Sequence, residues 1–147
     1  MTIYIGSDYA GYKLKEAIKK YLELRGLPFF DVGSKSDKAI NDFPAFARPV
    51  AKHVSSNKND RGILICGTGI GMCIAANRFK KVRAVLAFNL QQARWARTYD
   101  NANILCLSSW SVNNAQAKAI VRTWLDTPFK KLVRRVRRFK TIDSWRT

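Results

Sequence analysis

The chain has 147 residues, of which 47% are hydrophobic, enough for one sizeable core, so we expect a single domain over residues 1–147. No apolar run approaches the roughly eighteen residues of a membrane span and no leader-like segment follows Met1, which predicts a soluble, cytoplasmic protein with no membrane partner. Three cysteines without paired spacing and a single histidine argue against a disulfide scaffold and against a metal site.

The charge balance predicts an anionic ligand. Lys and Arg number 27 against 10 Asp and Glu, a formal net charge of +17, so the surface should attract phosphorylated metabolites or nucleic acid. Residues 129–147 hold eight of these basic side chains and Asp143 as their only acidic one. We do not expect nucleic acid as the partner, because the chain has no recognisable nucleic-acid-binding motif.

Short apolar runs alternate with segments of helical periodicity along most of the chain. Strands are predicted over 2–7, 28–32, 62–66, 83–88 and 103–107. The helices between them follow the apolar face of Leu14, Ile18 and Leu22, then that of Phe46, Val50 and Val54, and then 71–79, 90–99 and 113–125. Alternation of this kind predicts an α/β fold with a doubly wound, five-stranded parallel sheet, an α/β/α sandwich.

The end of the chain predicts one more helix, which is amphipathic. Pro128 should break the preceding helix, and beyond it Leu132, Val136 and Phe139 recur at helical intervals with arginines on the opposite side. We expect the apolar stripe to dock on the subunit or on a partner and the charges to stay in solvent.

A glycine-rich loop after the third strand is the best candidate for chemistry. Cys66 ends this strand, and Gly67, Gly69 and Gly71 follow it into a helix. Glycines allow a tight turn that brings backbone N–H groups to an anion, and a helix N-terminus favours negative charge and a thiolate. Asp8 closes the first strand, and in a parallel sheet it could lie beside Cys66 at the switch point.

Two nucleotide-binding motifs nearly match but do not fit. The three glycines give G-x-G-x-G rather than the dinucleotide fingerprint G-x-G-x-x-G, and residues 6–13 have one residue too many for a P-loop. From the residues alone, a structural turn with an apolar, buried Cys66 remains the alternative to a ligand site.

The amino-acid sequence of the glycine loop resembles that of a known family. The run LICGTGIGMCIAANR, residues 64–78, resembles the signature of the ribose 5-phosphate isomerase B and galactose 6-phosphate isomerase family, and most of all ribose 5-phosphate isomerase B. Shorter matches extend the resemblance over nearly the whole chain: Gly6-Ser7-Asp8, Ala10-Gly11, Leu14-Lys15-Glu16, Asp42-Phe43-Pro44, Val82-Arg83-Ala84 and Ala102-Asn103-Ile104-Leu105.

The resemblance implies a Rossmann-like sugar-phosphate isomerase of carbohydrate metabolism, acting in the pentose phosphate pathway without metal or cofactor. It implies a homodimer, or a dimer of dimers, with active sites shared between subunits. Cys66 would move a proton between C1 and C2 of the sugar, and the loop from Gly67 to Gly71 would stabilise the enediolate. The implied catalytic residues are Cys66, Thr68, Asp8 and Tyr99; the implied substrate-binding residues are Tyr9, Gly67, Gly69, Gly71, Asn77, Asp100, Trp110, Arg134 and Arg137.

Some of these positions depart from the family pattern. Tyr9 and Tyr99 replace two histidines, the second of which the family uses to open the sugar ring, and Trp110 replaces an arginine of the phosphate site. Two interpretations follow. One is a working isomerase, acting on ribose 5-phosphate or another sugar phosphate, whose ring opening depends on Asp8, Tyr99, Asp100 or solvent. The other is a divergent relative that binds an anionic ligand with altered substrate or lost catalysis.

Overall fold

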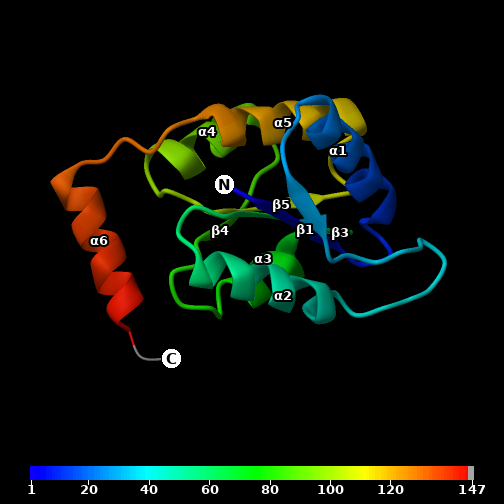
Figure 1. Ribbon diagram of the computed structural model, residues 1–147, viewed down its shortest axis with the longest axis horizontal. Coiled ribbons are helices and arrows are strands. Elements are labelled where there is room, and N and C mark those ends of the chain that lie inside the picture. Colours follow the sequence, from blue (N-terminus) through cyan, green and yellow to red (C-terminus); the bar gives the residue numbers. More distant parts are fainter. Residues whose placement is uncertain (146–147) are drawn as a thin grey trace.

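The computed structural model describes residues 1–145, so Arg146 of the basic tail lies outside the described residues. Figure 1 shows a parallel sheet between two layers of helices. The sheet order is β2-β1-β3-β5-β4. In chain order the elements are β1 (Ile3–Ser7), α1 (Tyr12–Leu24), β2 (Phe29–Asp31), α2 (Phe43–Ser56), β3 (Arg61–Cys66), α3 (Ile70–Ala76), β4 (Ala84–Leu86), α4 (Leu90–Thr98), β5 (Ile104–Ser108), α5 (Asn114–Asp126) and α6 (Val133–Ser144).

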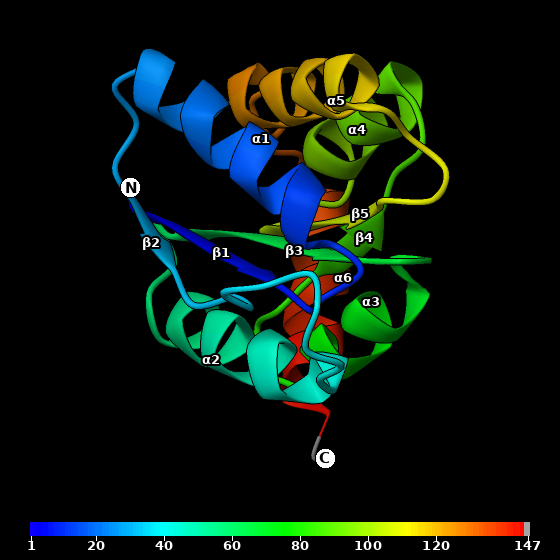
Figure 2. The ribbon, with the colours of Figure 1, turned by 90° about the vertical axis from the view of Figure 1, so that its right-hand side faces the viewer.

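The two faces of the sheet are covered by different helices. In Figure 2, α1, α4 and α5 lie on one side of the strands, and α2 and α3 lie on the other. Ile63 and Ile65 of β3 pack toward the first layer, whereas Leu64 and Cys66 pack toward the second, as the alternation of side chains along a strand requires. The predicted doubly wound, five-stranded parallel fold with its final helix is therefore confirmed.

Helix α3 and strand β4 end earlier than predicted. Helix α3 ends at Ala76 rather than at residue 79, and β4 covers only 84–86. The Asn77 side chain explains both boundaries, because its Nδ2 donates to the Ala84 carbonyl at 2.9 Å and its Oδ1 accepts from the Ala84 N–H at 2.9 Å. This pair of hydrogen bonds, called the clasp below, ends the helix and satisfies the backbone N–H and carbonyl of Ala84, the first residue of the edge strand.

A buried ion pair fixes the end of β2 beside β1. Lys15 of α1 is fully buried, and its ammonium donates to Asp31 Oδ2 at 2.6 Å and to the Ser34 carbonyl at 2.9 Å. Lys19 reaches the same Asp31 oxygen at 2.8 Å. Burial alone would raise the pKa of Asp31, but the hydrogen bonds from Lys15 and Lys19 lower it.

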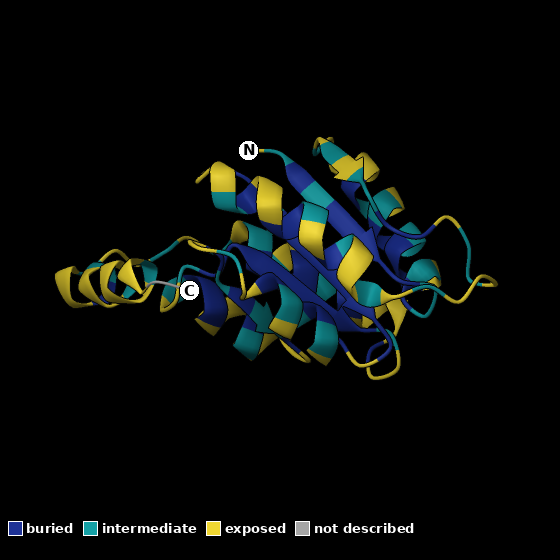
Figure 3. Cartoon of the chain, turned by 90° about the horizontal axis from the view of Figure 1, so that it is seen from below, coloured by how far each residue is buried: buried dark blue, intermediate teal, exposed yellow. Residues whose placement is uncertain are grey.

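Helix α6 stands apart from the two layers (Figure 1) and is largely exposed (Figure 3). Its arginines do not all lie in solvent, so that part of the prediction is wrong for Arg135, the only buried residue of α6. No helix of the described residues is long and apolar enough to cross a membrane. The cysteines are free, and within residues 1–145 no group of three or more His, Cys, Asp or Glu side chains could hold a metal ion.

Candidate functional site

Asp8 follows β1, and Cys66 is the last residue of the neighbouring strand β3, so both lie at the carboxyl edge of the sheet. In the register of β1 and β3, Ser7 pairs with Ile65, and each chain continues from this pair directly into Asp8 or Cys66. The sheet continues from β1 to β2 on one side and from β3 to β5 and β4 on the other. The strand order therefore reverses between β1 and β3, and such a switch point is where open α/β sheets bind ligands.

The glycine loop turns its backbone toward the Cys66 sulfur. The Gly69 N–H donates to Cys66 Sγ at 3.1 Å, and the Cys66 residue is 5% exposed. The sulfur of a cysteine is the atom that acts as a base or nucleophile, and the Gly69 N–H supplies a hydrogen-bond donor to it. Gly69, which belongs to the loop predicted to stabilise the enediolate, thus contacts the thiol in this structure.

Only glycine fits at position 69. Its φ of 76° lies in the left-handed region, and a Cβ there would come within 2.5 Å of Leu86 Cδ1 and 3.0 Å of the Leu107 backbone. The loop thus packs directly on the ends of β4 and β5, and Thr68, at its tip, is exposed with its Oγ1 accepting from the Ile70 N–H at 3.2 Å.

The other side of the site is formed by residues 8–11. Asp8 is 8% exposed, and its Oδ1 accepts from the Gly11 N–H at 3.0 Å. Burial raises the pKa of Asp8, and backbone hydrogen bonds from Gly11 and Ala10 only partly oppose it. Tyr9 follows, and its N–H donates to Asn41 Oδ1 at 3.0 Å, which ties this turn to the loop after β2.

The turn after β5 supports both loops, a role that the sequence did not reveal for Ser109. The Ser109 hydroxyl bonds to the carbonyls of Ala10 at 2.9 Å and Cys66 at 3.2 Å. The Gly67 carbonyl accepts from Ser108 Oγ at 2.7 Å and from the Trp110 N–H at 3.1 Å. Cys66 pairs with Ser108 in the register of β3 and β5. A prediction of this register would have placed both serines beside the glycine loop.

Trp110 lies against the glycine loop. A Cβ on Gly67 would come within 2.5 Å of the indole Cζ2, so the ring packs directly on the Gly67 backbone. The residue is nevertheless 74% exposed. The indole therefore presents a flat apolar surface beside Cys66 at the position where the family pattern has an arginine.

Tyr99, Asp100, Arg134 and Arg137 lie at the opposite edge of the sheet. Helix α4 runs back from the end of β4 to the start of β5, so Tyr99 and Asp100, which follow it, stand at the amino edge. The five residue steps of β3 span about 16 Å. One chain therefore does not bring these residues to Cys66, and Asn77, clasped to Ala84 at the same amino edge, does not face the loop either.

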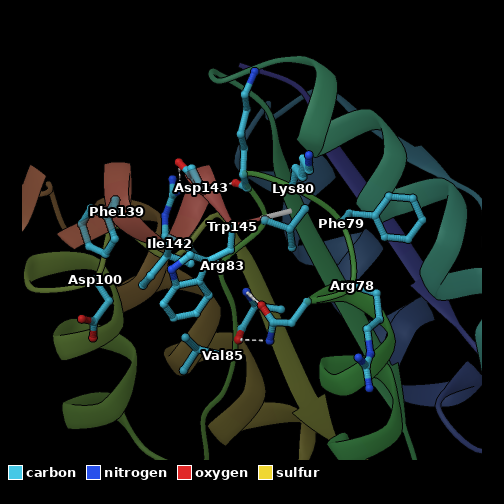
Figure 4. Close-up of a pocket in the computed structure, with 14 residues that line it drawn as sticks. Arg78, Phe79, Lys80, Arg83, Val85, Asp100, Phe139, Ile142, Asp143 and Trp145 are labelled. Carbon is cyan, nitrogen blue, oxygen red and sulfur yellow. Dashed lines mark hydrogen bonds and ion pairs between the residues drawn. The ribbon is translucent and has the colours of Figure 1, made fainter. Parts of the chain in front are cut away.

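Cavities separate α6 from the rest of the subunit at this amino edge. One of about 440 Å³ is lined by Tyr99, Asp100, Arg134, Arg135, Arg138 and Phe139. A neighbouring cavity of about 420 Å³, shown in Figure 4, has Arg83, which directly precedes β4, facing Phe139 and Asp143 of α6. The Arg83 Nη1 lies 3.8 Å from Asp143 Oδ2. The basic residues of α6, together with Tyr99 and Asp100, thus form a second, cationic group of residues.

Comparison with known proteins places these residues in a family. Residues 3–142 match the family described as Ribose/Galactose Isomerase. The chain is 43% identical over 130 residues to the probable ribose-5-phosphate isomerase B of Mycoplasma genitalium, covering 88% of this chain and 86% of that protein.

Solved structures agree. The ribose 5-phosphate isomerase of Thermotoga maritima superposes with a TM-score of 0.93 at 43% identity, covering 98% of both chains. The ribose-5-phosphate isomerase B of Mycoplasma genitalium with bound ribulose-5-phosphate gives 0.92 at 41% identity, covering 97% of this chain and 93% of that one. The chain therefore belongs to the ribose/galactose isomerase family and is most like its ribose 5-phosphate isomerases B.

Proposed function

We propose that this protein is an aldose-ketose isomerase of phosphorylated sugars and that it interconverts ribose 5-phosphate and ribulose 5-phosphate. The observation that carries the proposal is the Gly69 N–H directed at Cys66 Sγ at 3.1 Å, next to a buried Asp8 at the switch point. Isomerisation needs a base beside a carbon-bound proton and donors for the oxygen that becomes negative, and this corner of the sheet holds both.

The reaction requires only proton transfers. The Cys66 thiolate removes the C2 proton of the open-chain aldose, the electron pair forms a C1–C2 double bond, and the negative charge moves to O1. The O2 proton passes to O1 as the thiol returns its proton to C1, which leaves the carbonyl at C2. Asp8 is placed to hold the hydroxyls that exchange this proton, and Thr68 and the loop N–H groups stabilise the enediolate oxygen.

The two groups of residues support a dimer with shared sites. In a closed two-fold dimer, the carboxyl edge of one subunit can face the amino edge of the other, and the symmetry makes two equivalent sites. Cys66, Asp8, Tyr9 and Trp110 then come from one chain. Tyr99, Asp100, Arg134 and Arg137 come from the partner subunit and supply the ring-opening groups and the cations for the substrate phosphate.

The test is turnover of ribose 5-phosphate, followed as ribulose 5-phosphate, in wild type, Cys66→Ala and Cys73→Ala. Cys73 is also a free cysteine but lies on α3, where its Sγ donates to the Ala84 carbonyl at 3.3 Å. We expect Cys66→Ala to lose activity by at least about 10³-fold, as removal of an essential base does, and Cys73→Ala to retain it. A wild type that turns over no sugar phosphate would leave the anion-binding relative as the correct interpretation.

A further inference from the structure

Helix α6 touches its own subunit through few side chains. Phe139 packs on Phe129 with ring centroids 5.8 Å apart, and the Arg83 guanidinium lies 5.1 Å from the Phe139 ring. Asp143 meets Arg83 only at 3.8 Å. Val133 is 90% exposed, and Leu132 and Val136 are only partly buried, so the first turn has no fully buried apolar anchor among the described residues. The position of α6 therefore depends strongly on whichever residue of its first turns is buried.

That residue is Arg135, which is 6% exposed. Its Nη1 donates to the Thr98 carbonyl at 3.0 Å and to the Lys130 carbonyl at 2.9 Å. Thr98 is the last residue of α4, so the guanidinium caps the negative end of that helix. Within residues 1–145 no ion pair joins Arg135 to a carboxylate, which means that backbone carbonyls are what hold this cation.

The same guanidinium covers one face of Tyr99. Its central carbon lies 4.4 Å from the Tyr99 ring centroid, within the range of a cation-π contact. Tyr99 follows α4 directly and remains 45% exposed. Arg135 thus fixes the ring from one side and leaves the remainder of the side chain open to the cavity of about 440 Å³ that Arg134 and Arg138 also line.

We propose that Arg135 is the positioning residue of the cationic half of the site. It sets the orientation of Tyr99 and the placement of α6, and through α6 it aims the exposed Arg134 and Arg137 at the phosphate of a sugar phosphate held in the partner subunit. The inference deepens the proposed function and rests on it for the identity of the substrate. Arg135 is 6% exposed and its Nη1 is held by two carbonyls, so it acts through Tyr99 and α6 and not on the substrate itself.

A positioning role and a purely structural role differ in what they change. If Arg135 only stabilises the fold, its loss lowers the unfolding midpoint and leaves the folded protein with the same affinity for phosphate. If it aims the arginines, the folded variant binds phosphate more weakly, because hydrogen bonds to charged groups depend on alignment. Affinity for phosphate therefore separates the two roles.

The experiment compares Arg135→Gln and Arg135→Lys with Arg122→Gln, which removes the same charge from an exposed position on α5. The readouts are the KM for ribose 5-phosphate, kcat, and the dissociation constant of inorganic phosphate by calorimetry, after circular dichroism has shown that each variant is folded. We expect phosphate affinity to fall about tenfold or more in Arg135→Gln, as loss of one charged hydrogen bond does, and KM to rise more than kcat falls.

Arg135→Lys is the conservative variant, for use if Arg135→Gln does not fold. It keeps the charge and the aliphatic stem but loses the planar guanidinium and its stacking on Tyr99. It should also bind phosphate more weakly than wild type, while Arg122→Gln should match wild type. Equal phosphate affinity in wild type and the folded Arg135 variants would overturn the proposal, as would a wild type that binds no phosphate. Absence of turnover with intact, Arg135-dependent phosphate binding would instead refute the isomerase function and keep the role of Arg135.

Discussion

Replacing Gly69 with alanine tests whether the loop beside Cys66 is fixed by its backbone geometry. Gly69 and Gly26 both have positive φ, 76° and 62°, so Gly69→Ala and Gly26→Ala carry a similar left-handed strain of about 1–2 kcal/mol. Both also lose a similar amount of unfolded-chain entropy. The surroundings differ, because an added Cβ at Gly26 meets nothing within 4 Å.

At Gly69 the added Cβ meets two obstacles. Leu86 Cδ1, at 2.5 Å, is the end of a side chain and can move, but the Leu107 carbonyl group, at 3.0 Å, belongs to a central strand. Overpacking of this kind costs a further 1–3 kcal/mol or so. Gly69→Ala should therefore be less stable than Gly26→Ala by about 1–3 kcal/mol, equivalent to roughly 2–10 °C in midpoint for a domain of this size.

Urea unfolding of both variants and wild type measures the difference, at one protein concentration because the stability of the proposed dimer depends on it. The isomerase assay adds a second readout: Gly69→Ala displaces the N–H that donates to Cys66 Sγ, so its kcat should fall, whereas Gly26→Ala should keep the kcat of wild type. If the two variants lose the same free energy, the close packing of the loop on β4 and β5 is not what constrains position 69, and the reasoning fails.

Two further changes probe the supports of the site. Lys15→Met removes the buried partner of Asp31, leaves Lys19 at 2.8 Å and the exposed Lys35 at 3.8 Å, and should cost about 3 kcal/mol in urea unfolding. Because the folded-state pKa of Asp31 is lowered, the stabilisation from its ionised carboxylate is present above the unfolded pKa of about 4 and is lost as pH falls through the folded value. Wild type should therefore lose more stability below about pH 4 than Lys15→Met does. Parallel curves of unfolding free energy against pH would contradict this. Ser109→Ala breaks the hydroxyl bonds to two loop carbonyls and should cost about 1–2 kcal/mol together with a lower kcat, whereas Ser56→Ala, which loses a bond within α2, should leave kcat unchanged.

The fold was accessible from the sequence because every parallel strand here is a short apolar run. The alternation of such runs with helical periodicity leaves few other architectures, and it also places Asp8 and Cys66 at the same edge. Arg135 was not accessible, since amphipathic periodicity assigns a charged residue to solvent and cannot show that the end of α4 offers carbonyls there. The structural role of Asn77 was not accessible for a similar reason: its hydrogen bonds to the backbone of Ala84 lie across a turn that no spacing rule describes.

The two groups of residues lie at opposite edges of the sheet, which predicts that two inactive variants can complement each other. A site built within one chain would not show this complementation. Cys66→Ala disables the carboxyl edge and Arg137→Ala the amino edge, so each homodimer should be inactive or severely impaired. In a mixed dimer, one of the two sites combines Cys66 of the Arg137→Ala chain with Arg137 of the Cys66→Ala chain. This site is intact, and the other site lacks both residues.

Random reassociation of equal amounts should therefore restore about a quarter of the wild-type sites, since half of the dimers are mixed and each has one intact site. The assay is turnover of ribose 5-phosphate after joint refolding, with each variant refolded alone as the control. Recovery of activity requires residues at opposite edges of the sheet to meet across an interface, because neither chain carries both groups. If the mixture stays as inactive as its components while wild type recovers, the two edges do not combine across an interface, and the proposal of shared sites is wrong.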